Sequence, residues 1–434
     1  MRLELADFPV KDLVFGSETK YCNGILEINK EELLCLILKD SRITSASLDV
    51  AFPNEQTRIV KIRDVVEPRV KVSGPGCVFP GILGPVETVG EGRTHRLSGV
   101  TVIPSAEYSP TIPTGTTAQA SGFVDMWGPG SHVTPFASTI NIVLLFKLIE
   151  DVSELEAHNA IQLAEFTVAH HLAETTRHKT PENIEVFDLT NVDSFLPRVV
   201  YIMSCLTEVR SPREIAYYGL SIRESLPTFI HPNELFDGAI TTDARRAEGL
   251  TISTWEWMNQ PVVLGLFKEH GRSLNFVGVI LQRTRFETEH GKLVTAACTS
   301  QMARLLGADG SIQTTMTPSG NNFMDVMLTL QQLEKKGIRT TLLTPEWGGR
   351  DGTELPLVFS VPEATSIVST GGMERELKLP APTKVIGCEE NNLIKLRPED
   401  EPFLPWSEFV IDGRSHINGG IDWWGRLHIT CKDY

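Results

Sequence analysis

The stretch HPNELFDGAI, residues 231 to 240, contains four polar residues within seven positions. His231 and Glu234 are side chains that can transfer protons in an active site, so we predict both as catalytic. Asn233 and Asp237 can hydrogen-bond a ligand, so we predict both as substrate-binding. The alternative is a capped turn, in which Asn233 caps a short helix and Asp237 with Gly238 forms the turn.

The loop TPSGNN, residues 317 to 322, is expected to follow a strand and to precede a helix. Backbone N–H groups at a helix N-terminus can hold an anion such as a carboxylate, so we predict Asn321 as substrate-binding. The alternative is a connecting loop in which Asn321 or Asn322 caps the helix. The loop is not a GxGxxG fingerprint and lacks the lysine of a P-loop, so nucleotide binding is unsupported.

The loop TPEWGGRDG, residues 344 to 352, also follows an expected strand. We predict Glu346 as a catalytic acid or base and Arg350 as a clamp that binds a substrate carboxylate. The alternative is a glycine-rich turn with a surface ion pair.

The loop DMWGPGSHVTPF, residues 125 to 136, combines Asp125 and His132 with a stiff Gly-Pro-Gly turn. A stiff loop suits a preorganised site, so we predict Asp125 and His132 as substrate-binding. Asp125 could instead hydrogen-bond the backbone of the turn. With His231 it could belong to a metal site, which leaves a divalent metal open as a cofactor and its ligands unknown.

The composition describes a globular protein with a large core: 41% of the residues are hydrophobic and 22% are charged. A net charge of −15 argues against nucleic acid or an anionic membrane as the main partner. The longest apolar run, 140 to 149, is too short to span a bilayer, and the N-terminus lacks a secretory signal pattern. The seven cysteines show no CxxC spacing, so we expect reduced thiols and a cytoplasmic protein.

The pattern of elements predicts an α/β fold with a β-rich N-terminal region, residues 1 to 110. An α+β domain with the Gly-Pro-Gly loop is expected over 111 to 245. From 246 to 434, strands alternate with helices, which predicts a doubly wound, Rossmann-like parallel sheet with a strand-rich tail. Loops that follow parallel strands lie at one edge of the sheet, where ligands bind, so the loops 315 to 322, 344 to 352 and 370 to 372 should lie together.

Several segments in one order resemble the α/β proprotein of component B of the glycine, sarcosine and betaine reductases, a family related to the D-proline reductase proprotein. The segments include GFVDMWGPGSHVTPFASTINIV, YGLSIRESLPTFIHPNELFDGAI, LEKKGIRTTLLTPEWGGRDG and STGG. The resemblance covers about residues 95 to 375, and we expect it to extend over the whole chain. It implies a subunit that binds an amino acid or betaine and joins a partner subunit, often a selenoprotein, for reductive cleavage of a C–N bond.

In that family the proprotein is cut before a cysteine that follows the DGA-[IV] motif, and the cysteine becomes a pyruvoyl group. This chain has Arg245 where the resemblance places the cysteine, and Cys205 and Cys298 are more than 35 residues away. Thr241 and Thr242 precede the cut point, and a threonine would not give a pyruvoyl group. We therefore expect an intact chain without pyruvoyl.

Three functions remain open at this point. The first is a subunit of a component-B-like complex that acts on C–N bonds of a small amino acid, betaine or amide, in a hetero-oligomer with a selenoprotein B homologue. The second is a metal-dependent hydrolase or lyase of a small nitrogen compound. The third is a non-catalytic structural subunit of such a complex.

Overall fold

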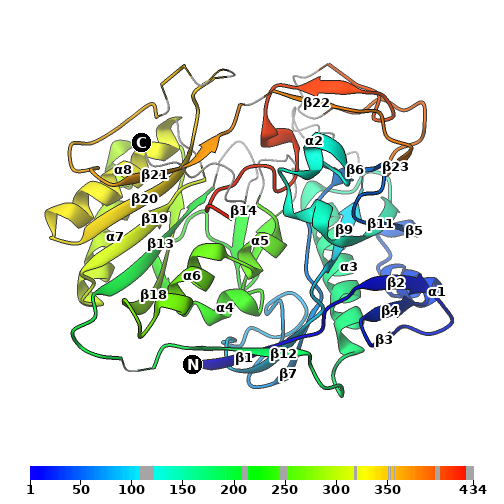
Figure 1. Cartoon of the computed structure of the whole chain (residues 1–434), viewed down its shortest axis with the longest axis horizontal. Helices are drawn as coiled ribbons and strands as arrows, with labels where there is room; N and C mark the ends of the chain where they lie inside the picture. Colours follow the sequence, from blue (N-terminus) through cyan, green and yellow to red (C-terminus); the bar gives the residue numbers. More distant parts are fainter. Residues whose placement is uncertain are drawn as a thin grey trace.

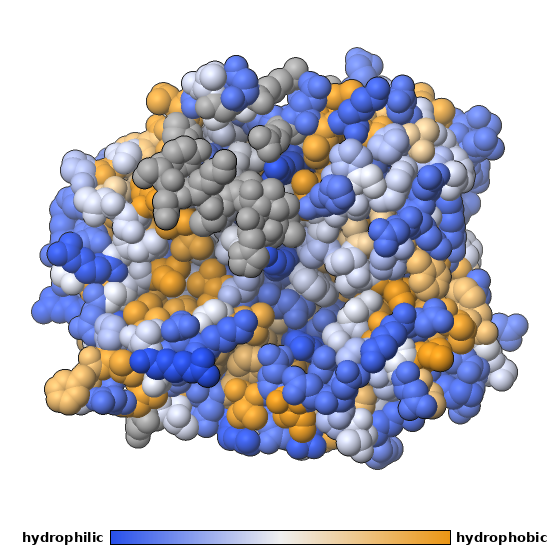
Figure 2. Space-filling view, in the orientation of Figure 1, coloured by the Kyte–Doolittle hydropathy of each residue, from blue (hydrophilic) through white to orange (hydrophobic). Residues whose placement is uncertain are grey.

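The computed structural model describes residues 1–106, 122–190, 192–207, 214–243, 252–316, 320–349, 351, 353–355, 357–374, 376–395 and 401–426. Two halves lie side by side (Figure 1): one holds the six-stranded sheet formed between residues 198 and 372, and the other holds most strands of the first 150 residues together with the strands at 377–379 and 384–386. Hydrophilic residues cover much of the face in Figure 2, and hydrophobic residues form several separate groups among them.

A six-stranded sheet in the order β16-β18-β13-β19-β20-β21 forms one half of the molecule. All neighbouring strands in it are parallel except β16, which is antiparallel to β18. The strands are β13 (Arg198–Leu206), β16 (Thr228–Ile230), β18 (Asn275–Thr284), β19 (Gly310–Thr314), β20 (Arg339–Glu346) and β21 (Ile367–Gly372). The continuous apolar run of β13 is buried because helices cover both faces of the sheet.

Alternate residues of β13 show the two covered faces. Val200 and Ile202 pack with α7 (Glu289–Leu305) and α8 (Gly320–Lys335), whereas Tyr201 and Met203 pack with α5 (Thr254–Met258) and α6 (Pro261–Glu269). The predicted α/β fold, with a doubly wound parallel sheet after a β-rich N-terminal region, is therefore confirmed.

The second large sheet has the order β10-β6-β9-β11-β5, and β23 pairs with β6. Its strands are β5 (Ile43–Ala51), β6 (Thr57–Ile62), β9 (Val100–Ser105), β10 (Gly122–Asp125), β11 (Ile140–Leu148) and β23 (Lys384–Ile386). The long helix α3 (Glu154–Glu174) packs against this sheet, and Ser153 with Glu156 forms a capping box at its N-terminus.

Smaller sheets complete the fold. They are β12-β1-β8-β7, β2-β4-β3, β15-β14-β17 and β22-β24. Their strands are β1 (Arg2–Asp7), β2 (Asp12–Phe15), β3 (Lys20–Cys22), β4 (Ile25–Ile28), β7 (Arg69–Ser73), β8 (Gly92–Arg96), β12 (Asn183–Asp188), β14 (Glu214–Tyr217), β15 (Leu220–Ser221), β17 (Ile240–Asp243), β22 (Leu377–Leu379) and β24 (Phe409–Ile411). The remaining helices are α1 (Lys30–Ile37), α2 (Gly128–Ser131), α4 (Asn233–Phe236) and the 3-10 turns η1 (Pro135–Ser138) and η2 (Arg414–His416).

Strands from different predicted domains pair with each other, and the domain boundaries themselves stay predictions. Strand β1 pairs with β12, and β6 pairs with β23, so segments far apart in sequence share sheets. The segment HRLSGVTVIPS divides into β8 and β9, which lie in different sheets. The break falls at Gly99, whose φ of +79° suits glycine. In the described part of the chain, no helix is long and apolar enough to cross a membrane.

Candidate functional site

The carboxyl ends of the parallel strands meet at one edge of the six-stranded sheet, here called the carboxyl edge. The chain leaves β13 at Leu206, β18 at Thr284, β19 at Thr314 and β20 at Glu346 along this edge (Figure 1). Of the three predicted loops, 315 to 322 begins directly after β19 and 344 to 352 spans the end of β20 and the residues after it, whereas 370 to 372 are the last residues of β21 itself. Since ligands of doubly wound folds bind beyond the carboxyl ends of strands, this edge is the candidate site.

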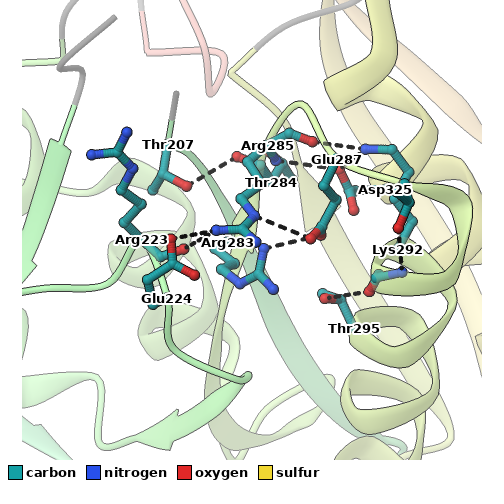
Figure 3. Close-up of polar contacts among 12 residues, drawn as sticks. Thr207, Arg223, Glu224, Arg283, Thr284, Arg285, Glu287, Lys292, Thr295 and Asp325 are labelled. Atoms are coloured by element: carbon teal, nitrogen blue, oxygen red, sulfur yellow. Dashed lines mark hydrogen bonds and ion pairs between the residues drawn. The ribbon is translucent and has the colours of Figure 1, made fainter. Parts of the chain in front are cut away.

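A buried ion pair holds the chain where it leaves β18 (Figure 3). Lys292 of α7 lies 2.6 Å from Asp325 of α8, and both side chains are fully buried. The Lys292 ammonium also donates to the carbonyl of Arg285 at 2.8 Å, and the N–H of Arg285 donates to Asp325 at 3.3 Å. The pair therefore binds both polar groups of one backbone residue at the carboxyl edge.

The side chains around this clamp form a charged network. Glu287 accepts from Arg283 at 3.0 Å and from Arg285 at 3.1 Å, and Arg285 also donates to Glu224 at 2.6 Å (Figure 3). Asn321, in the first turn of α8, accepts a hydrogen bond from the N–H of Glu287 at 3.1 Å. The loop after β18 is thus tied to both helices that follow it.

Burial sets the protonation of Asp325. Loss of solvent raises its pKa to about 6, although the neighbouring Lys292 lowers it. One oxygen of this carboxyl, Oδ1, is buried without a hydrogen-bond partner in the described part of the chain. A carboxyl in this state can exchange a proton near neutral pH. Neither Lys292 nor Asp325 was predicted, because a lysine and an aspartate on helices are most often surface residues.

Two of the predicted residues lie at this edge. Glu346 ends β20, is half-buried, and accepts from Ser369 of β21 at 2.5 Å. Asn321 lies inside α8, not at its cap as the alternative had it, because the helix already begins at Gly320. Arg350 lies outside the described residues, as do 317 to 319.

The residues of the stretch from 231 to 237 lie at the opposite edge of the sheet. Strand β16 is antiparallel to β18, with Thr228 opposite Leu281 and Ile230 opposite Val279. The chain therefore leaves β16 toward the amino ends of the parallel strands. His231 and Glu346, both predicted as catalytic, do not belong to one site.

The side chains of His231 and Glu234 form hydrogen bonds to neighbouring residues of the protein. The ring Nδ1 of His231 accepts from the N–H of Asn233 at 3.2 Å, and burial lowers the pKa of His231 to about 4. Glu234 accepts from the hydroxyls of Tyr217 at 2.7 Å and Tyr218 at 2.9 Å, and from the N–H of His231 at 2.8 Å. His231 is thus a neutral imidazole at physiological pH, and the carboxylate of Glu234 ties α4 to β14. Their catalytic roles stay predictions.

Asp237 and Asn233 connect α4 to the N-terminal strands. Asp237 is fully buried, pairs with Lys71, and accepts from the N–H of Gly90 at 2.8 Å. Asn233 is also fully buried and donates to the carbonyls of Gly90 at 3.1 Å and Phe187 at 3.2 Å. It does not cap α4, whose N-cap is Pro232. These contacts favour structural roles for both residues.

Asp125 and His132 lie in the other half of the molecule. Asp125 is fully buried and forms a bidentate ion pair with Arg58, at 2.6 and 2.9 Å. His132 is exposed at the end of α2. The carboxylate of Asp125 is therefore engaged by Arg58 rather than by the backbone of its turn.

A buried polar group that the sequence did not reveal lies on α3, near Asp64. Glu165 of α3 is fully buried, and neither of its oxygens has a hydrogen-bond partner among the described residues. Burial and the nearby charge of Asp64 raise the pKa of Glu165 well above its usual value. One turn earlier, Gln162 donates to the carbonyl of Thr242 at 3.2 Å. The spacing of 162 and 165 places both on one helix face, but the sequence does not show that this face is buried.

The described residues contain no group of three or more His, Cys, Asp or Glu side chains that could hold a metal ion. Cys205 is buried at the end of β13, and burial raises the pKa of its thiol strongly. The thiol of Cys205 is therefore a poor nucleophile at neutral pH.

Comparison with known proteins finds similarity to one family along nearly the whole chain. The family model of glycine/sarcosine/betaine reductase component B subunits matches residues 1–395. The glycine reductase complex component B subunits alpha and beta of Acetoanaerobium sticklandii are 33% identical over 400 residues, 91% of this chain and 90% of the relative. The sarcosine reductase complex component B subunit alpha of Peptoclostridium acidaminophilum is 34% identical over 404 residues, 89% of each chain.

The betaine reductase complex component B subunit alpha of Peptoclostridium acidaminophilum is 33% identical over 401 residues, 89% of this chain and 88% of the relative. No solved structure matches the chain. The match to the family model and the identity to relatives of all three reductases extend well beyond the segments that carried the resemblance. The chain therefore belongs to the family of glycine/sarcosine/betaine reductase component B subunits.

Proposed function

We propose that the chain is a subunit of a component-B-like complex that cleaves a C–N bond of a small amino acid or betaine. The observation that carries the proposal is the similarity over about nine-tenths of both chains to component B subunits named for glycine, sarcosine and betaine reductases. The partner would be a selenoprotein B homologue, and the complex would work in the cytoplasm.

The substrate would bind at the carboxyl edge of the six-stranded sheet. Asn321 and Arg350 would bind its carboxylate, and Glu346 would move a proton at the nitrogen that leaves. The clamp of Lys292 and Asp325 would fix the backbone of Arg285 beside the substrate, because positioned groups lose less entropy during a reaction. Support for this placement comes from the parallel strands, which end at this edge.

The residue types that follow the DGAI motif argue against a pyruvoyl group. Arg245 occupies the position where the resemblance places the cysteine, and an arginine has no thiol or hydroxyl to attack a carbonyl. The hydroxyl of Thr242 is engaged, since it donates to the carbonyl of Ile252 and accepts from Trp257 at 3.0 Å. We therefore propose that the chain stays intact, and we derive no step through a protein ketone.

The test uses the chain co-purified with a selenoprotein B homologue of a component B complex. Intact mass should give one species of full length, and two fragments would contradict the proposal of an unprocessed chain. The complex, with a dithiol as reductant, is then given glycine, sarcosine or betaine, and the release of ammonia, methylamine or trimethylamine is measured. Release of one amine supports C–N cleavage. No release with any substrate, together with stable binding of the partner, would indicate a structural subunit.

A further inference from the structure

Strand β12 forms one edge of the sheet β12-β1-β8-β7, and Figure 1 shows it near the lower margin of the molecule. On one side, β1 pairs with it along its whole length, from residue 183 to residue 188. In the described part of the chain, no strand pairs with its other side. The free edge therefore offers a row of backbone N–H and C=O groups to another strand.

The hydrogen bonds of β1 show which residues of β12 face the free edge. The N–H of Phe8, just after β1, donates to the carbonyl of Arg96 in β8 at 3.0 Å, so the even-numbered residues of β1 direct their backbone groups toward β8. The odd-numbered residues therefore bond to β12, and the residues of β12 opposite them are also odd-numbered. Because successive residues of a strand bond to opposite sides, Ile184, Val186 and Asp188 direct their backbone groups to the free edge.

The free edge of β12 lacks the features by which edge strands usually avoid pairing with another molecule. Its six residues include neither lysine nor proline, and its pairing with β1 has no bulge. The side chains of Ile184 and Val186 are 38% and 50% exposed. The carboxylate in the middle of the strand, Glu185, is bound by Arg96 at 3.0 Å. The centre of the edge is therefore apolar, β-branched and without an unpaired charge.

The strand is complementary to a second copy of itself. When two copies pair antiparallel with Val186 opposite its own copy, Ile184 of each lies opposite Asp188 of the other. All three outward residues then fall in hydrogen-bonded pairs, whereas a register shifted by one position leaves one of them outside the pairing. A twofold axis relates the two strands in this arrangement, as in most homodimers.

The charges on either side of β12 also favour this arrangement. His178 and Lys179 are exposed before the strand, and Asp193 is exposed after it. An antiparallel pairing brings the beginning of one strand to the end of the other, so Lys179 of each copy lies at the same end as Asp193 of the other. The opposite charges offset, at this edge, the repulsion between two chains that each carry −15.

We propose that two copies of this chain associate through antiparallel pairing of β12, which joins their two four-stranded sheets into one continuous sheet. The occupant of the free edge is therefore a second copy of the chain. Strand β12 leads into the amino end of β13, so the interface lies away from the carboxyl edge. The proposal goes beyond the function proposed above and does not depend on it.

The test measures the mass of the full chain by sedimentation velocity over a series of protein concentrations. A species of twice the chain mass is expected to increase with concentration. Val186→Lys and Val186→Glu should each weaken this association by about tenfold or more, because like charges then lie opposite each other across the twofold axis. An equal mixture of the two variants should recover the dimer, since the lysine of one copy then lies opposite the glutamate of the other.

The control is Val410→Lys, which changes a valine of similar exposure, 53%, on strand β24 and should leave the association unchanged. A chain that is monomeric at every concentration would overturn the proposal, as would a dimer that Val186→Lys does not weaken or a mixture that does not recover it. If the chain alone is monomeric and Val186→Lys instead blocks binding of a selenoprotein B homologue, the edge belongs to that subunit and the proposal of a second copy is wrong.

Discussion

Glu165 shows how a single buried group can be recognised by what it lacks. Its carboxyl is fully buried on α3, near Asp64, and has no hydrogen-bond partner among the described residues. Because burial raises its pKa, the folded protein holds a proton that the unfolded chain releases above its ordinary pKa of 4.5. Folding stability from this residue therefore falls as the pH rises above that value.

We predict that Glu165→Gln stabilises the protein at pH 8, by about 1.4 kcal/mol for each pKa unit by which folding raises the pKa of Glu165, because the amide needs no proton whereas Glu165 must take one up when the chain folds. At pH 4 the two proteins should have nearly equal stability, since Glu165 is then protonated in the folded state and in most of the unfolded chains, where its pKa is 4.5. Urea unfolding at both pH values measures the difference. Glu390→Gln, at an exposed position, is the control, and a Glu165→Gln gain that is equal at both pH values would contradict the explanation.

His231 should affect folding stability in the opposite direction, because it destabilises the folded protein in acid. Its pKa falls from 6.5 to about 4 because of burial and, to a lesser extent, the N-terminal ammonium. The unfolded chain thus binds a proton below pH 6.5 that the folded protein refuses, so stability from His231 is complete above that pH and is lost as the pH falls toward 4.

Between pH 7 and pH 5, His231 should account for a loss of about 2 kcal/mol, at 1.36 kcal/mol for each pKa unit. His231→Gln should remove that part of the acid sensitivity, whereas His178→Gln, at an exposed position, should not. The free energy of unfolding in urea, measured at both pH values, tests this prediction. An equal loss of stability from pH 7 to pH 5 in the parent protein and in His231→Gln would contradict it.

At the scale of elements, the clamp between α7 and α8 determines how the chain leaves β18. Lys292 and Asp325 bind each other and both backbone groups of Arg285, and Asn321 binds the next turn of the loop. The same two helices pack against one face of the sheet through Ala303 and Leu333. The clamp therefore links the helix layer to the loop that borders the candidate site.

We predict that Asp325→Leu and Lys292→Met alone each cost about 3–5 kcal/mol of stability, because each leaves a buried charge without its partner. The double variant should cost less than the sum of the two, since no unpaired charge remains. A double-mutant cycle by urea unfolding measures the coupling. Glu224→Leu, which removes the exposed carboxylate of the Arg285 pair, should cost less than about 1 kcal/mol, and additive costs in the cycle would contradict the clamp.

Across the whole molecule, Arg58 joins the tail to the N-terminal sheet. Its guanidinium pairs with Asp125 and donates to the carbonyls of Pro380, Pro405 and Ser407, at 3.0, 2.7 and 3.1 Å. It also lies over the ring of Phe409, 4.5 Å from the centroid. One buried side chain thus holds together segments that are more than 300 positions apart in the sequence.

We predict that Asp125→Asn destabilises the protein by about 3–5 kcal/mol, because Arg58 would remain buried without a counter-charge. Hydrogen exchange should increase first in the described segments near 380 and 405, which depend on Arg58. The control is Asp49→Asn, which breaks the half-exposed pair with Lys384 and should cost about 1 kcal/mol or less. If hydrogen exchange increased at the carboxyl edge and not near residues 380 and 405, the proposed role of Arg58 in holding the tail would be contradicted.

Local patterns in the sequence determined the elements of this protein and the order in which they occur. The apolar run of β13, the alternation of strands and helices after residue 246, and the capping box of α3 each depend on neighbours a few positions away, so they could be predicted. The quoted blocks likewise pointed to the component B family, which the comparisons confirmed.

Only the tertiary structure decided which polar residues share a site. The direction of the short strand β16 places His231 and Glu234 at the opposite edge of the sheet from Glu346 and Asn321, and three residues of sequence carry no signal of that direction. Burial was equally hidden: Lys292, Asp325 and Glu165 have the residue types of a solvated surface. Their environment is set by helices and strands that pack from distant parts of the chain, and such contacts depend on the whole fold rather than on local sequence.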